Sequence, residues 1–119
     1  MRHPLLALER LRSVTRELLV LETHVDMLWA RRPAMAFYPG RELAGDNSNW
    51  WGPNPRAVDA MLRAAGFREV RLVSTFSLPH HGRRRLRREA RNVIRDSRRA
   101  RRPVLWALRR GRVVFHAVP

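Results

Sequence analysis

A helix with clear start and stop signals, followed closely by a strand, is the feature that most constrains the fold of this chain. Asn54 and Pro55 are residue types that favour the N-cap and first turn of a helix, and Gly66 stands where a C-terminal glycine cap belongs. We therefore expect a helix over residues 55–65. Residues 70–76 alternate in polarity, which predicts a strand only a few residues later. A helix and a strand at this spacing are typical of an α/β fold.

The first 25 residues repeat this order of helix and strand. A first-turn proline and leucines at helical spacing predict a helix over residues 4–15. Residues 18–25 begin with a continuous apolar run and turn polar at Glu22 and Thr23. This pattern predicts a buried parallel strand whose carboxyl end carries polar side chains to a ligand-facing edge. A closing strand is expected over residues 112–118.

Residues 27–53 form a long connection that prolines and glycines interrupt, so we expect no regular structure there. The connection contains two adjacent tryptophans, Trp50 and Trp51, directly after Asn49. Paired rings in a loop either fold back onto apolar neighbours or stay available to stack on a flat ligand. The sequence leaves both interpretations open.

Arginine is the only strongly basic residue type, with 25 arginines, no lysine and a net charge of +15. Fourteen of the arginines lie in residues 82–112, where apolar residues at helical spacing predict a helix over residues 84–101. Arginine suits phosphate contacts, but a GC-rich genome would encode the same bias. If the segment binds nucleic acid, the candidate contacts are Arg83, Arg84, Arg85, Arg87 and Arg88.

Most motifs that carry catalysis are missing, and no catalytic residue can be assigned. The chain has no cysteine, which excludes thiolate-bound zinc and fits a reducing cytoplasm. It has no glycine-rich phosphate loop, and no apolar run is long enough to span a membrane. His80 and His81 have no acidic partner nearby, so we expect no metal site. Glu22 and Asp26, at the end of the first strand, either contact a ligand or cap a neighbouring loop.

Five short segments occur in a characteristic order between residues 2 and 76. They are His3-Pro4-Leu5, Leu18-Leu19-Val20-Leu21-Glu22-Thr23, Tyr38-Pro39-Gly40, Asn49-Trp50-Trp51-Gly52-Pro53 and Ala65-Gly66-Phe67. Together they resemble the C-terminal half of class I S-adenosylmethionine-dependent methyltransferases, with a weaker match over residues 112–118. The chain is most similar to the bacterial group related to the tRNA wobble-uridine 5-oxyacetate (5-methoxyuridine) methyltransferases.

The resemblance implies a single partial domain, residues 1–119, that holds strands five, six and seven of a Rossmann-like methyltransferase sheet. Residues 83–103 would be an arginine-rich helical insertion that departs from the family pattern. The resemblance also implies a substrate-side loop at Asn49, Trp50 and Trp51. The cofactor of the intact enzyme would be S-adenosyl-L-methionine or a carboxylated derivative of it.

The glycine-rich cofactor turn of that family would lie before residue 1, and this chain contains no Gly-x-Gly. We therefore expect a truncated, cytoplasmic methyltransferase that binds no cofactor and is inactive alone. Its first strand would lack its inner neighbour, which leaves an edge open to a missing N-terminal half or to self-association. Two alternatives remain: a non-enzymatic arginine-rich module that binds RNA such as tRNA, and a subunit of a split methyltransferase.

Overall fold

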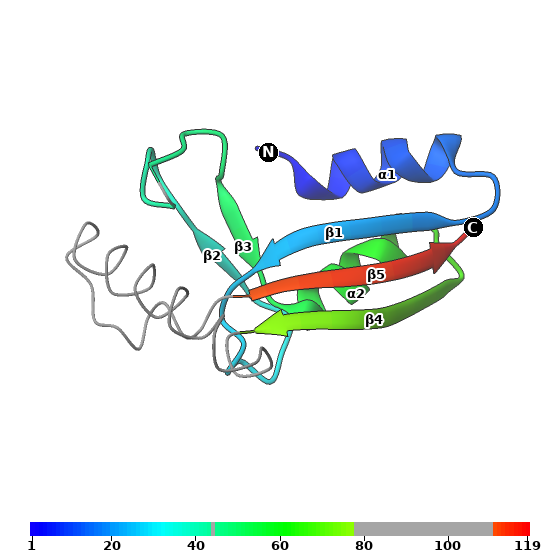
Figure 1. Cartoon of the computed structure of the whole chain (residues 1–119). Helices are drawn as coiled ribbons and strands as arrows, with labels where there is room; N and C mark the ends of the chain where they lie inside the picture. The colour runs from blue at the N-terminus through cyan, green and yellow to red at the C-terminus, as the bar shows by residue number, and fades with distance from the viewer. Residues whose placement is uncertain (44, 78–110) are drawn as a thin grey trace, which may run out of the picture.

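A computed structural model of the chain describes residues 1–43, 45–77 and 111–119. It shows a small α/β fold in which α2 packs against one face of a three-stranded sheet and α1 runs alongside β1 (Figure 1). In chain order the elements are α1 (Pro4–Val14), β1 (Leu19–Val25), β2 (Met35–Phe37), β3 (Trp51–Pro53), α2 (Pro55–Ala64), β4 (Glu69–Ser77) and β5 (Gly111–Val118).

The predicted helices and strands that fall on the described residues are confirmed, and each end differs from its prediction by at most one residue. The prediction of an irregular connection over residues 27–53 is wrong in part, because β2 and β3 form a two-stranded antiparallel sheet. Strands of three residues are too short to show an alternating pattern, and β3 also contains a glycine and a proline. The helix predicted over residues 84–101 lies outside the described residues.

The main sheet has the strand order β1-β5-β4, and β5 is antiparallel to both neighbours. Phe115 of β5 thus stands opposite Leu21 of β1 on one side and Leu72 of β4 on the other. The prediction of a parallel and buried first strand is wrong in two respects. β1 is antiparallel to β5, its described neighbour, and one face of β1 is exposed. Val20 is 58% exposed because the described elements cover only the opposite face of the sheet.

The hydrophobic core lies between α2 and the covered face of the sheet. Val58 and Leu62, one helical turn apart, are fully buried against Val113, Phe115 and Ala117 of β5. Alternate residues of a strand point to the same face, so these three side chains all lie on the α2 side. Burial of this apolar surface is the main source of stability in a domain of this size.

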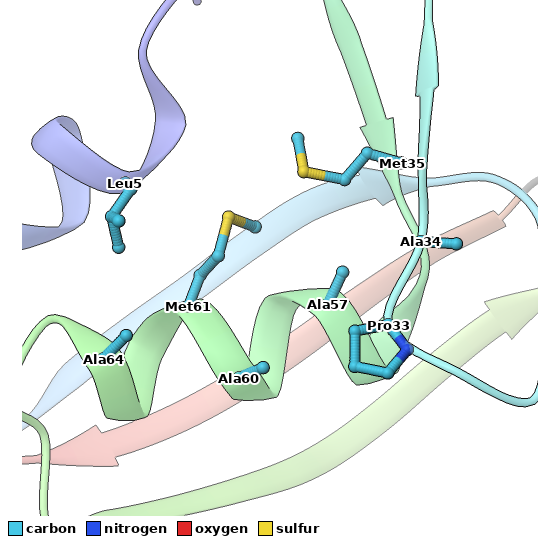
Figure 2. A pocket seen from close by; sticks show the side chains of 8 residues that line it. All are labelled: Leu5, Pro33, Ala34, Met35, Ala57, Ala60, Met61 and Ala64. Carbon is cyan, nitrogen blue, oxygen red and sulfur yellow. The ribbon is translucent and has the colours of Figure 1, made fainter.

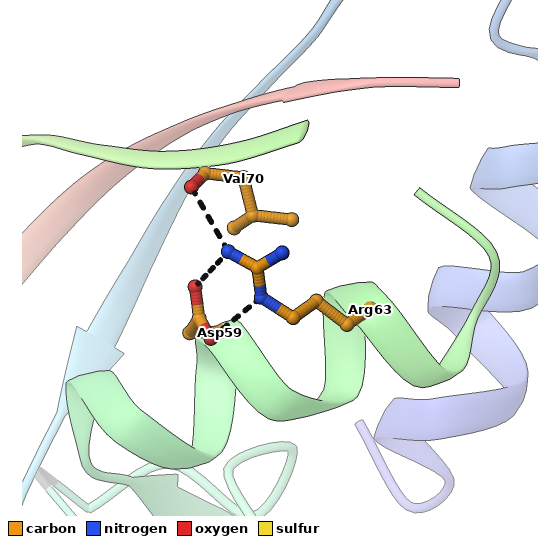
Figure 3. A network of polar contacts seen from close by, with 3 residues as sticks. All are labelled: Asp59, Arg63 and Val70. Atoms are coloured by element: carbon orange, nitrogen blue, oxygen red, sulfur yellow. Dashed lines mark hydrogen bonds and ion pairs between the residues drawn. The ribbon is translucent and has the colours of Figure 1, made fainter. Parts of the chain in front are cut away.

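An ion pair on the exposed side of α2 reaches the start of β4 (Figure 3). The Arg63 guanidinium donates from Nε to Oδ2 of Asp59 at 3.0 Å and from Nη2 to the Val70 carbonyl at 3.5 Å. Both charged side chains are more than a third exposed, so solvent screens their attraction and the pair contributes about 0.5 kcal/mol at most.

Asn54 joins the start of α2 to the loop that follows β1, and it is only 1% exposed. Its Oδ1 accepts hydrogen bonds from the backbone N–H of Ala57 at 2.8 Å and of Ala34 at 3.2 Å. Its Nδ2 donates to the carbonyls of Ala30 at 3.2 Å and Arg32 at 2.7 Å. One side chain therefore caps a helix and holds a loop, using both its acceptor and its donors.

Replacing Asn54 tests whether this double role stabilises the fold. We expect Asn54→Ala to lower the free energy of unfolding by about 3 kcal/mol, because a cap is lost and buried carbonyls lose their donor. Asn54→Asp keeps the cap acceptor but turns a carboxylate oxygen toward two carbonyls, so it should also destabilise the protein. Urea unfolding measures both effects, with Asn47→Ala in an exposed turn as the control. An Asn54→Asp variant as stable as the parent would show that only the cap matters.

Candidate functional site

A buried carboxylate stands directly after the carboxyl end of β1. Asp26 is 5% exposed, and its Oδ2 accepts a short hydrogen bond from the hydroxyl of Tyr38, which is 2% exposed. Oδ1 accepts from the backbone N–H of Met27 at 2.6 Å. The Asp26 N–H donates to the Pro53 carbonyl at 3.1 Å, which links the end of β1 to β3. Both carboxylate oxygens are thus engaged by the protein itself.

The backbone around this carboxylate is unusually constrained. Met27 has a φ of +51°, in the left-handed region that residues other than glycine rarely adopt. A Cβ added at Gly52 would lie 2.5 Å from the Tyr38 hydroxyl oxygen and 3.0 Å from the Asp26 Cβ. Only glycine therefore lets β3 pass so close to the Asp26–Tyr38 pair.

The predicted strand-end residues Glu22 and Thr23 lie within β1, four and three residues before Asp26, and take no part in the Asp26–Tyr38 pair. Glu22 Oε1 accepts a hydrogen bond from Arg112 Nη1 of β5 at 2.6 Å, with both side chains more than half exposed. The Thr23 hydroxyl donates to the adjacent His24 carbonyl at 3.4 Å. A ligand-binding role for either residue stays a prediction.

The two tryptophans of the loop contact residues of the chain itself. The ring of Trp51 lies 4.8 Å from that of Phe37, between centroids, and its Nε1 donates to the Arg2 carbonyl at 2.9 Å. The Arg2 guanidinium lies 4.6 Å from the centre of the Trp50 ring, at a distance typical of a cation–π contact. Both rings are half-buried. In this structure Trp51 folds back on an apolar neighbour, whereas Trp50 stacks on a flat cation.

Asn49, the third residue of the predicted substrate-side loop, lies in a turn built on Asp46. Its Nδ2 donates to Asp46 Oδ2 at 2.8 Å, while the Ser48 N–H donates to Asp46 Oδ1 at 2.8 Å. The hydrogen bond from the Ser48 backbone stabilises the carboxylate and lowers the pKa of Asp46. This turn precedes Trp50 and Trp51 and orders the chain that carries them.

The remaining predicted contacts, Arg83, Arg84, Arg85, Arg87 and Arg88, lie outside the described residues, as do His80 and His81. Among the residues that the structure does describe, no three histidine or carboxylate side chains come together as metal ligands would. None of the helices in this described part is both long and apolar enough to cross a bilayer.

Comparison with protein-family models, with curated proteins and with solved structures found no match to the chain. The site is therefore interpreted from its own geometry. Sequence reasoning singled out Glu22 and Thr23 but missed the pairing of Asp26 with Tyr38 and the need for Gly52. The signals were the position of Asp26 at the end of the first strand and that of Tyr38 and Gly52 within the segments that carry the resemblance.

A Cβ added at position 52 would collide with the Tyr38 hydroxyl, so substitutions at these two positions should have non-additive effects on the free energy of unfolding. Tyr38→Phe should lower the free energy of unfolding by about 2 kcal/mol, because the buried Asp26 carboxylate loses a donor. Gly52→Ala should also destabilise the protein, since its Cβ strikes the Tyr38 hydroxyl. The double variant lacks that hydroxyl, so its loss should be smaller than the sum of the two single losses. Urea unfolding that gives strictly additive losses would contradict this close approach.

Proposed function

We propose that this chain is the substrate-side, C-terminal part of a class I S-adenosylmethionine-dependent methyltransferase of the tRNA-modification type. Its cofactor-binding half would be supplied by a separate segment or chain, so this part alone would be inactive. The intact enzyme would act in the cytoplasm. The observation that carries the proposal is the free edge of β1 with α1 beside it.

The outer edge of β1 is open to a further strand. Within the described parts of the chain, β1 is hydrogen-bonded in a sheet only to β5. Leu18, directly before β1, and Val20, near its start, are both about half exposed. Unpaired strand edges with apolar side chains favour association with another strand. The edge of β1 is thus suited to pair with a strand outside the described residues.

The position of α1 favours a parallel strand at this edge. A helix that leads into a strand usually connects it to a parallel neighbour by a right-handed crossover. α1 leads into β1, contacts α2 and contributes Leu8 to the core on the face of the sheet that α2 covers, as such a crossover helix would. The resemblance makes β1, β4 and β5 strands five, six and seven of a larger sheet, which accords with one sheet that is open on the β1 side.

The residues beyond the carboxyl end of β1 fit a wall for the methyl acceptor. In open α/β sheets, ligands bind outside the carboxyl ends of the strands. The half-buried Trp50 and Trp51 follow that end of β1 in the chain, and the buried Asp26–Tyr38 pair holds the backbone there. S-adenosylmethionine supplies its own electrophilic methyl group, so the protein orients the acceptor and excludes water rather than providing a nucleophile. In this proposal the other half binds the cofactor, since the glycine-rich turn of the family has no counterpart in this chain.

The proposal is tested by titrating S-adenosylmethionine into the chain alone and into the chain co-expressed with the polypeptide encoded immediately upstream. We expect heat of binding only for the combined protein. Val20→Lys should weaken the association of the two parts about 10-fold or more, because the new charge would stand beside the added strand and lose part of its hydration there. Val73→Lys puts the same charge on β4, the opposite edge, and should leave association unchanged. Cofactor binding by the chain alone would overturn the proposal.

The positive charge of the chain favours RNA binding as a second candidate function. Thirteen of the 25 arginines lie in residues 78–110, and the net charge is +15. Such a chain, with or without methyltransferase activity, should bind RNA through phosphate contacts. This function would not need the free edge of β1.

Fluorescence anisotropy with a labelled tRNA distinguishes specific use of the arginine block from net charge alone. We expect affinity to fall steeply with salt, and neutralising Arg83, Arg84, Arg85, Arg87 and Arg88 should make the salt dependence shallower. The matched control neutralises five exposed arginines elsewhere, namely Arg10, Arg16, Arg41, Arg68 and Arg71. Equal losses in the two variants would show that the arginine block has no special part in binding.

A further inference from the structure

An open apolar groove lies between α1, α2 and the start of β2, outside the site described above (Figure 2). Its volume is about 370 Å³. One flank of α2 forms its floor through Ala57, Ala60, Met61 and Ala64. Leu5 of α1 borders it on one side, and residues 33–35 border it on the other. Among the residues that the structure describes, no side chain that lines the groove carries a polar group.

The shape of the groove fits a helix better than a small molecule. Small-molecule sites are usually enclosed and contain a few polar groups that orient the ligand, and this groove has neither property. Ala57, Ala60 and Ala64 recur at helical spacing along about 10 Å of the axis of α2. Their small side chains let another backbone approach closely, as in packed helix pairs. The groove is thus long enough for about two turns of a second helix.

The two methionines give this surface an adaptable apolar contact. Figure 2 shows Met35 and Met61 extending into the space between β2 and α2. Methionine is flexible and polarisable, and grooves that bind amphipathic helices use it often. Leu5, 40% exposed, adds a further apolar side chain at the α1 side. A partner helix would therefore contribute a stripe of large apolar residues.

The charges around the groove indicate the chemistry of the other faces of that helix. Arg31 and Arg32 directly precede the segment that borders the groove, and Arg56 precedes its floor; all three side chains are exposed. Within the described parts of the chain, none of the three forms an ion pair. The carboxylates on α1 and α2 are Glu9 and Asp59, and Asp59 is already paired with Arg63. The residues next to the groove in sequence therefore carry an excess of positive charge, which attracts carboxylates.

We propose that the groove between α1, α2 and β2 is a docking site for an acidic amphipathic helix of a partner protein. The apolar stripe of that helix would lie on the alanines of α2 between Leu5 and Met35. Its flanking glutamates or aspartates would face Arg31, Arg32 and Arg56. This proposal is independent of the methyltransferase function, because the groove shares no residue with the free edge of β1.

The probe is a labelled helical peptide of about 15 residues, with leucines at i, i+3, i+4 and i+7 and mostly glutamates elsewhere. Fluorescence anisotropy with the full chain should show binding at least ~10-fold tighter than for the same peptide with lysines in place of glutamates. A third peptide keeps the glutamates but has serines in place of the leucines. We expect it to bind at least ~10-fold more weakly than the first peptide, since it lacks the apolar stripe.

Ala60→Arg separates docking in the groove from simple attraction to the arginines. The new side chain fills the groove but adds a positive charge, so a peptide held by charge alone would bind as well or better. We expect binding to fall at least ~10-fold instead. Ser13→Arg adds the same charge at an exposed position of α1 outside the groove and should leave affinity unchanged. Circular dichroism checks that the Ala60→Arg variant keeps its helix content. If this folded variant binds the leucine peptide as well as the parent does, the proposal is overturned. Equal binding of the leucine and serine peptides to the parent would overturn it too.

Discussion

The rest of the fold depends on the insertion of β5 between β1 and β4. β1 and β4 do not pair with each other. β5, which has eight residues and comes last in the chain, joins them into one sheet. β5 also supplies Val113, Phe115 and Ala117 to the core under α2. The sheet can form only when residues about 90 positions apart in sequence have met, as Glu22 and Arg112 do. Placing β5 in the centre leaves β1 and β4 as the described edges.

The two edges differ in their surroundings, and this difference underlies the functional proposal. β1 has α1 alongside it and is followed by the buried Asp26–Tyr38 pair, whereas the pairing of β4 with β5 has a register shift between Leu72 and Ser74. Irregularities of this kind discourage further pairing at an edge. A regular, half-apolar edge beside a crossover-like helix is instead suited to a further strand. The same end of β1 carries the residues that we assign to the acceptor side.

Local signals in the sequence predicted most of the helices and strands, and contacts between distant residues account for what they did not predict. Asn54, Pro55 and Gly66 predicted α2 because capping depends on neighbouring residues. The second role of Asn54, as donor to the Ala30 and Arg32 carbonyls, depends on a loop that precedes it by more than 20 residues. The antiparallel neighbour of β1 and the contact of Arg2 with Trp50 are equally non-local. The pairing of Asp26 with Tyr38 was missed for the same reason. The sequence showed only that Glu22 and Asp26 stand at the end of the first strand.

Amide hydrogen exchange along residues 19–25 tests the central claim most directly. In the chain alone, the N–H groups of β1 that point away from β5 should exchange quickly, because they have no partner in the sheet. When the cofactor-binding half is added, these amides should become protected, while the outward amides of β4 continue to exchange quickly. Exchange in β1 that stays unchanged, despite association of the two parts, would contradict the claim that this edge completes a methyltransferase sheet.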